Sequence, residues 1–240
     1  MKRLAPFFSY YGSKWRMAPM YPAPKHDEII EPFAGSAQYA TLHHTKRVVL
    51  LDKNPIIVGV WQYLIRVSET ELRALPLDFD DIRDVPGLPQ EARWFVGFWL
   101  NAAVAAPRHR PSKWTKFNAG KKLACSWGET CRERVASQLR YIRHWQVAEA
   151  DYRELPPYRA TYFVDPPYRG APGRHYPQSS DAIDYAHLAN WCLSREGQTI
   201  VCEGAGADWL PFQSLGQTRG TIDNDGNRRV VKELVYTCER

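Results

Sequence analysis

The sequence predicts an α/β protein built on a parallel sheet. Two short runs rich in strand-forming residues, 28–34 (EIIEPFA) and 47–52 (RVVLLD), are each followed by a segment whose apolar residues recur at helical spacing. Runs of the same kind return after residue 147. Strands that alternate with helices favour parallel pairing with crossover connections, and 240 residues suffice for such a core with an inserted lobe.

The first half of the chain is expected to open strand, turn, helix, strand, helix. Residues 28–34 form the first strand, which reaches a turn at Gly35, and QYATLHH continues as a helix. The second strand, 47–52, ends in Asp52. The next helix is NPIIVGVWQYLIRV, in which Pro55 suits the first turn.

The character of the chain changes near Ser68. An acidic, proline-punctuated stretch (69–90) precedes an apolar helical stretch (91–106), a cationic loop (107–122) and a further helix (128–145). We therefore predict that residues 69–146 form a helical insertion in a core made of 1–68 and 147–240. In the second part of that core, strands are expected within 147–155, 160–168, 197–205 and 227–239.

The composition narrows the class of protein and its surroundings. A net charge of +6 fits a polyanionic partner, and it fits solubility equally well. There is no apolar run of about 18 residues and no segment typical of a secretory signal, so no membrane partner is expected. The five cysteines show no C-x-x-C or zinc spacing, which predicts reduced thiols, no metal site and a cytoplasmic location.

Two loops near the start of the core carry features of a ligand site. EPFAGSA, 31–37, follows a strand, and its small residues allow a ligand to approach the backbone; a tight turn without a ligand is the alternative. Asp52 ends the next strand, where an acid accepts hydrogen bonds from ribose hydroxyls in doubly wound folds. A helix-capping aspartate is the alternative there.

The strongest motif is YFVDPPY, residues 162–168. Two prolines fix the backbone at the end of a strand, where open parallel sheets bind their ligands. Asp165 and the carbonyl of Pro166 offer two adjacent acceptors, Pro167 holds the turn, and Tyr168 offers a flat ring. This set suits a planar group with an exocyclic amine, and a surface Asp-Pro-Pro turn is the alternative.

Four segments in this order resemble the Dam-type (D12 class) DNA adenine-N6 methyltransferases, which use S-adenosylmethionine. They are YYGSKWR at 10–16, EPFAGSA, LLDKNP at 50–55, and DPPY. ADYRE before DPPY and KEL near the C-terminus are weaker matches, and 69–146 match only in position and character. Ala37 departs from the pattern, which usually has glycine there.

The resemblance implies a Rossmann-like S-adenosylmethionine-dependent methyltransferase sheet with an inserted, mainly helical DNA-recognition lobe. It implies that Tyr10 and Lys14 contact the cofactor, while Asp52 takes the ribose hydroxyls. It also implies that three residues lie against the methionine part of the cofactor: Glu31, Phe33 and Gly35. Asp165 would lie near both the cofactor and the target base.

The expected function is transfer of a methyl group to adenine N6 of a base flipped out of double-stranded DNA. No metal is required, the protein would be a monomer or weak dimer, and restriction-modification, phage protection and regulation are all compatible roles. Cytosine-N4 methylation, a catalytically idle DNA-binding relative and a basic nucleotide-binding protein are the alternatives.

The cationic segment RHRPSKWTK, 108–116, is the expected DNA contact of the insertion. Its candidate side chains for phosphates or a guanine edge are Arg108, Arg110, Lys113, Trp114 and Lys116. A solvated basic loop is the alternative. WFVGFWL, 94–100, favours the core of the lobe, and 169–185 is either a loop that orders on DNA or a flexible connection.

Overall fold

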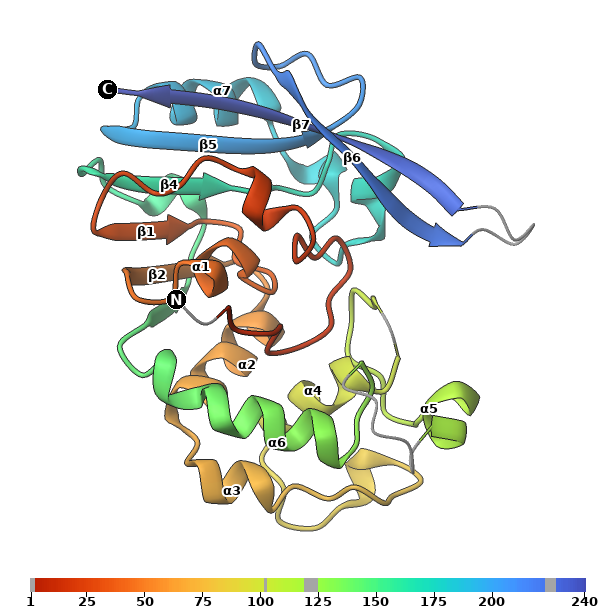
Figure 1. Ribbon diagram of the computed structural model, residues 1–240. Helices are drawn as coiled ribbons and strands as arrows, with labels where there is room; N and C mark the ends of the chain where they lie inside the picture. Colours follow the sequence, from red (N-terminus) through yellow and green to blue (C-terminus); the bar gives the residue numbers. More distant parts are fainter. Residues whose placement is uncertain (1–2, 102, 119–124, 223–227) are drawn as a thin grey trace.

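The centre of the molecule is a mixed sheet whose strands follow the order β3-β2-β1-β4-β5-β7-β6 (Figure 1). The computed structural model describes residues 3–101, 103–118, 125–222 and 228–240, with the side chains of these residues except 114, 118, 172, 218–222 and 228–231. The strands are β1 Glu28–Glu31, β2 Arg47–Asp52, β3 Gln146–Glu149, β4 Ala160–Val164, β5 Gly197–Gly204, β6 Gln213–Ile222 and β7 Arg228–Glu239.

The pairing of the strands creates a switch point at the centre of the sheet. β1 pairs in parallel with β2 on one side and with β4 on the other. β3 and β5 extend the two sides in parallel, whereas β7 runs antiparallel to both β5 and β6. Strand order therefore reverses between β1 and β4, as in Rossmann-like folds, and this confirms the predicted α/β class.

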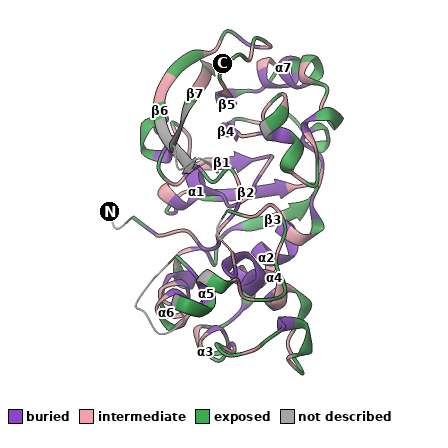
Figure 2. Ribbon diagram, turned by 90° about the vertical axis from the view of Figure 1, so that its right-hand side faces the viewer, coloured by how far each residue is buried: buried purple, intermediate pink, exposed green. Residues whose placement is uncertain are grey.

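Both faces of the central strands are buried, which explains their continuous apolar runs. Successive side chains of a strand point to opposite faces. Ile29, Leu50 and Phe163 belong to one apolar cluster, and their neighbours Ile30 and Leu51 belong to another. Figure 2 shows the buried residues concentrated on β1, β2, β4 and β5.

Helices cover both faces of the sheet. They are α1 Gln38–Leu42, α2 Pro55–Arg66, α3 Glu69–Arg73, α4 Gln90–Trp99, α5 Lys113–Asn118, α6 Glu129–Gln138 and α7 Tyr185–Leu193. Residues of α1 pack in the cluster of Ile29, and residues of α7 pack in the cluster of Ile30, so these two helices lie on opposite faces. None of the described helices combines the length and the apolar character needed to cross a membrane.

The helices α3 to α6 gather beside the β3 edge of the sheet (Figure 1). In the described residues between β2 and β3 the regular structure is helical, in agreement with the predicted insertion. Its apolar side chains, Phe95 and Leu139 among them, belong to the same cluster as Phe8 and Trp61 of the core. The division at residues 69 and 146 stays a prediction, because one hydrophobic core spans it.

Two expectations for this region are wrong, one on the end of a helix and one on a loop. α4 ends at Trp99 rather than near 106, because the chain folds back and the amide of Arg108 donates to the carbonyl of Gly97 at 3.0 Å. A Cβ on Gly97 would lie 2.5 Å from the carbonyl oxygen of Arg108, so glycine permits this close return. The segment expected to be a cationic loop contains the short helix α5.

Trp61 of α2 links the helical part of the molecule to the loop after β1. Its side chain is fully buried, and its Nε1 donates to the carbonyl of Gly35 at 2.9 Å. The ring also contacts Phe7 and Phe8 at centroid distances of 5.7 and 5.4 Å. Trp61 therefore stabilises the backbone of the EPFAGSA loop.

We expect Trp61→Phe to lower the free energy of unfolding by about 2–4 kcal/mol, because it leaves a cavity and removes the donor to the half-buried carbonyl of Gly35. Trp145→Phe is the matched control, since Trp145 is 3% exposed and its Nε1 has no hydrogen-bond partner in the part of the chain that the structure describes. Urea unfolding should give a smaller loss for the control. Equal losses would contradict a stabilising role for the bond to Gly35.

Candidate functional site

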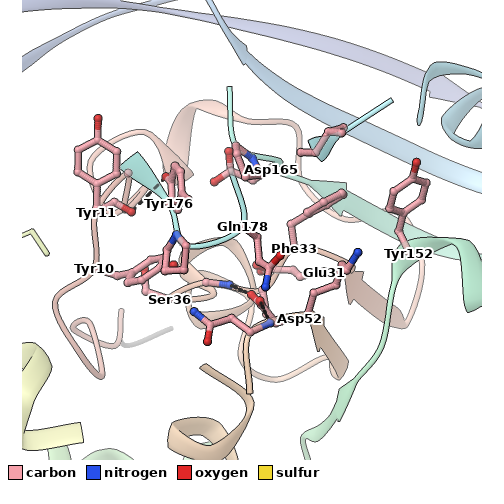
Figure 3. A pocket seen from close by; sticks show the side chains of 18 of the residues that line it. Tyr10, Tyr11, Glu31, Phe33, Ser36, Asp52, Tyr152, Asp165, Tyr176 and Gln178 are labelled. Atoms are coloured by element: carbon pink, nitrogen blue, oxygen red, sulfur yellow. Dashed lines mark hydrogen bonds between the residues drawn. The ribbon is translucent and has the colours of Figure 1, made fainter. Parts of the chain in front are cut away.

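A cavity opens at the carboxyl ends of β1, β2 and β4, next to the switch point of the sheet (Figure 3). Its empty volume, which includes space open to solvent, is about 1110 Å³. Residues from six parts of the chain line it: 10–14, 31–38, 52–54, 151–153, 163–167 and 176–184. The strand-end loops singled out from the sequence thus meet in one place, where doubly wound folds bind their ligands.

The loop after β1 turns sharply through two residues in the left-handed region. Gly35 has φ +45°, and Ala37 has φ +44°. A Cβ on Gly35 would lie 3.3 Å from Cε1 of Tyr10, so glycine also lets the ring of Tyr10 approach. Ala37 bears the strain of an L-residue in this region, about 1–2 kcal/mol, which explains why glycine is usual in the pattern it departs from.

Glu31 ends β1 and points into the same loop. Its side chain is almost fully buried and accepts a hydrogen bond from the amide of Ala40 at 2.6 Å. Burial raises the pKa of Glu31 well above its usual value, and the nearby carboxylate of Asp165 adds to this. Amides at the start of a helix are the donors that bind phosphate in dinucleotide sites. Here the amide of Ala40 already donates to Glu31, so it is not available to such a ligand.

Asp52 bridges the loops after β1 and β2. One carboxylate oxygen accepts from the amide of Gly35 at 3.0 Å, and the other accepts from the amide of Asn54 at 2.9 Å (Figure 3). The cap of α2 is Asn54, whose Oδ1 accepts from the amide of Ile56 at 3.0 Å. Asp52 therefore does not cap the helix; it holds the two loops together. Its carboxylate also lines the cavity.

Asp165 follows β4 and forms an ion pair with Lys14. The distance from Nζ of Lys14 to Oδ1 of Asp165 is 2.8 Å, and Nζ lies 4.0 Å from Oε1 of Glu233. Burial raises the pKa of Asp165 to about 6, although the ammonium of Lys14 opposes this. Burial opposes the charge on Lys14, but the carboxylates of Asp165 and Glu233 outweigh it and raise its pKa.

The other residues of DPPY surround this pair unequally. Pro167 lines the cavity with Asp165, whereas Pro166 is buried and Tyr168 lies behind the lining. The hydroxyl of Tyr168 donates to Glu233, and the Lys14 ammonium lies over its ring, 4.5 Å from the centroid. The ring that the sequence offered for base stacking is thus covered by Lys14, and its stacking role stays a prediction.

Tyr10 and Phe33 occupy different parts of the lining. Tyr10 is 8% exposed, and burial raises its pKa well above the usual value. Phe33 contacts the ring of Tyr152 at a centroid distance of 5.5 Å. Tyr152, in the ADYRE segment, shares a hydrogen bond of 2.9 Å with Nδ1 of His187. The predicted cofactor residues therefore share one cavity, although their roles stay predictions.

Sequence reasoning missed the outer wall of the cavity. Within 169–185, two short 3₁₀ helices form, Ala171–His175 and Ser180–Ala182. Tyr176 packs against Tyr10 and Tyr11 at 5.9 and 5.3 Å, and its hydroxyl donates to the carbonyl of Tyr11 at 3.3 Å. The Gly, Pro and Ser content of this segment indicated a loop, but it held no signal for these ring contacts.

The cationic segment 108–116 is partly neutralised by acids of the same lobe. Arg110 pairs with Asp81 at 3.0 Å, and Lys116 pairs with Asp80 at 3.2 Å. Arg108 and Lys113 are exposed, and neither forms an ion pair with any residue that the structure describes. The side chain of Trp114 lies outside the described residues. The two unpaired cations are thus the better candidates for an anionic partner.

No family model and no curated protein matches the chain. Three solved structures from Pyrococcus horikoshii show a distant likeness. They are a provisionally assigned transferase (TM-score 0.36, 10% identity, 94% of this chain, 63% of that one), TYW2 in complex with MeSAdo (0.37, 9%, 93%, 61%), and a provisionally assigned RNA methyltransferase (0.37, 7%, 93%, 77%). This chain spans less than two thirds of the first two, and likenesses at this level do not bear on its activity.

Among the described residues, no group of three or more His, Cys, Asp or Glu side chains is arranged to hold a metal ion. The polar groups that line the cavity are carboxylates, amides and hydroxyls, with Lys14, Lys53 and Arg153 as cations. Lys53 and Arg153 both pair with Asp151, at 2.9 and 2.7 Å. The cavity is therefore suited to a ligand that carries positive charge or hydrogen-bond donors.

The buried carboxylate of Asp52 gives a testable pH dependence. Burial raises its pKa from 3.8 to about 6, so between these values the folded protein holds a proton that the unfolded chain has released. Its contribution to stability therefore falls as pH rises through this window. Relative to wild type, Asp52→Asn should gain about 2–3 kcal/mol in unfolding free energy between pH 4 and pH 7.

Urea unfolding of both proteins at pH 4 and pH 7 measures this difference. The comparison cancels the titration of the other carboxyl groups. A difference between variant and wild type that is the same at both pH values would contradict the burial of a charged Asp52.

Proposed function

We propose that the protein is an S-adenosylmethionine-dependent DNA methyltransferase that acts on adenine N6. The observation that carries the proposal is the place of Asp165. It stands at the carboxyl end of β4, in the same cavity as Gly35 and Asp52, beside the switch point of the sheet. The expected acceptor of the target amine and the expected cofactor loops therefore open onto one space.

The lining of the cavity supports a cationic cofactor over a dinucleotide. Glu31 takes an amide at the start of α1, so a pyrophosphate there would meet a buried carboxylate. Oε1 of Gln38 is buried and has no hydrogen-bond partner among the described residues, which leaves an acceptor for an amine. S-adenosylmethionine would supply a methyl group activated by a sulfonium centre, and the adjacent carboxylates favour that positive charge.

The residues proposed to hold the cofactor follow from these contacts. Asp52 has lone pairs left for ribose hydroxyls after accepting from two amides. Glu31 and Gly35 lie at the turn where the methionine part would approach the backbone. Tyr10, Lys14 and Phe33 complete the proposed set around the cavity.

Asp165 is proposed to accept one N–H of the target amine, with the carbonyl of Pro166 accepting the other. Its pKa of about 6 keeps the carboxylate ionised at neutral pH. The carboxylate would stabilise positive charge that develops on the amine, and good orientation of the reactants is worth roughly 7–11 kcal/mol. Because Lys14 covers the ring of Tyr168, stacking of the base requires this ammonium to move.

The helical lobe is proposed to hold the duplex while the target base leaves the stack. Arg108 and Lys113 are exposed and unpaired within the described chain, so both can neutralise phosphates without breaking an ion pair. Arg110 and Lys116 would first have to leave Asp81 and Asp80. Phosphate contacts of this kind position the protein and make binding sensitive to salt.

Methyl transfer from radiolabelled S-adenosylmethionine to unmethylated duplex DNA, followed by nucleoside analysis, tests the proposal. Methyladenine supports it, and methylcytosine would instead indicate a cytosine-N4 enzyme. A parallel reaction on RNA separates the two nucleic acids. Absence of any methylated nucleoside would contradict the enzyme proposal.

We expect Asp165→Ala to reduce transfer by about 10²–10⁴-fold, because the amine loses its charged acceptor. DNA binding should be retained, since Asp165 lies inside the cavity. Asp27→Ala is the control, because this aspartate is highly exposed at the opposite end of β1. Full activity of Asp165→Ala would refute the assignment.

We expect the double variant Arg108→Ala/Lys113→Ala to weaken DNA binding and to flatten its salt dependence. Each lost phosphate contact lowers the slope of log K against log salt by about 0.9. The control Lys25→Ala/Arg47→Ala removes two exposed cations from the opposite end of the sheet. Equal slopes for all three proteins would argue against phosphate contacts at 108–116.

A further inference from the structure

Glu233 is a buried acid that the proposed reaction leaves unused. It lies on β7, and its side chain is 3% exposed. It is not among the described residues that line the cavity. A buried carboxylate is costly unless charges or hydrogen bonds compensate it, so its partners indicate its purpose.

One carboxylate oxygen of Glu233 contacts three polar groups near the cavity. Oε1 accepts from the hydroxyl of Tyr21 at 2.6 Å and from the hydroxyl of Tyr168. The ammonium of Lys14 lies 4.0 Å from the same oxygen, while it pairs with Asp165 at 2.8 Å. Glu233 thus connects to two groups that face the expected target amine, the Tyr168 ring and the Lys14–Asp165 pair.

The neighbouring strand β5 leaves the space that this arrangement needs. The cross-strand partners of Glu233 are Gly204 on β5 and Gly216 on β6. A Cβ on Gly204 would lie 3.0 Å from Cδ2 of Tyr168, so the ring rests against a position without a side chain. The hydrogen bond to Glu233 and the contact with Gly204 restrict the orientation of Tyr168.

We propose that Glu233 is a positioning residue for methyl transfer, which it serves by fixing the hydroxyl of Tyr168 and by sharing the ammonium of Lys14 with Asp165. The inference rests on the proposed function. When a base displaces the ammonium of Lys14 from the ring of Tyr168, Glu233 offers that ammonium a second carboxylate to approach. It also keeps the plane of that ring constant while Lys14 moves.

The shared charge predicts a signature that a merely structural residue would lack. The negative charge of Glu233 raises the pKa of Asp165, so its removal should shift the acidic limb of the rate profile to lower pH. The other charged or titratable groups that face Asp165 are Lys14, Glu31, Glu203, Tyr21, Tyr168, Tyr176 and Cys202. Glu233→Gln leaves all of them in place.

The experiment compares wild type, Glu233→Gln, Tyr168→Phe and the double variant in methyl transfer to duplex DNA, with circular dichroism as a check of folding. Glu233→Gln should lower kcat about 10-fold, leave KM for S-adenosylmethionine within twofold, and move the acidic limb to lower pH. The double variant should be no slower than the slower single variant, because both changes remove one interaction.

Glu239→Gln is the matched control, because Glu239 lies on the same strand and its carboxylate pairs with Lys25 and His26. If Glu233→Gln matches this control in both kcat and the acidic limb, the inference is overturned and the proposed function stands. If the wild-type protein transfers no methyl group to DNA, both the inference and the proposed function are contradicted.

Two further variants serve if Glu233→Gln does not fold. Tyr168→Phe removes one donor to Glu233, and Tyr21→Phe removes the other. The inference expects a lower kcat for Tyr168→Phe and a wild-type kcat for Tyr21→Phe. Equal rates for these two variants would overturn it.

Discussion

The ion pair between Lys14 and Asp165 is the contact on which the cavity depends. Strands of a parallel sheet that end in acids gather negative charge at one edge, here from Asp52 and Asp165. Burial makes each of these charges costly, and the ammonium of Lys14 offsets part of the cost at 2.8 Å from Asp165. The pair also ties the segment before β1 to the end of β4, so it closes one side of the cavity.

The same charges select the chemistry of a ligand. In dinucleotide sites, helix amides attract phosphate, but here the amide of Ala40 already bonds to Glu31. Phosphate would add negative charge where carboxylates already stand. A ligand with a sulfonium and an amine adds the opposite charge, and it also offers donors to acceptors such as Oε1 of Gln38. Electrostatics and hydrogen bonding therefore favour the same class of cofactor.

Local sequence patterns predicted the sheet edge better than they predicted its surroundings. The positions of Gly35, Asp52 and Asp165 could be predicted from the strand ends, because parallel strands bring their carboxyl ends together. Strand β6 was not predicted, since its sequence, QSLGQTRGTI, is polar and contains two glycines. The contacts of Lys14 with Asp165 and Glu233 were also beyond prediction, because no local rule relates residues so far apart in the chain.

The hydrophobic cluster that unites the helical lobe with the sheet limits how the molecule can meet a large partner. Phe95, Trp127 and Leu139 pack in the same cluster as Phe7 and Trp61. Hinge bending between lobe and sheet would expose these side chains to water at a cost of roughly 1.5–3 kcal/mol each. The lobe and the sheet therefore meet any large partner as one rigid body, and a fit that needs a change of shape depends on the partner.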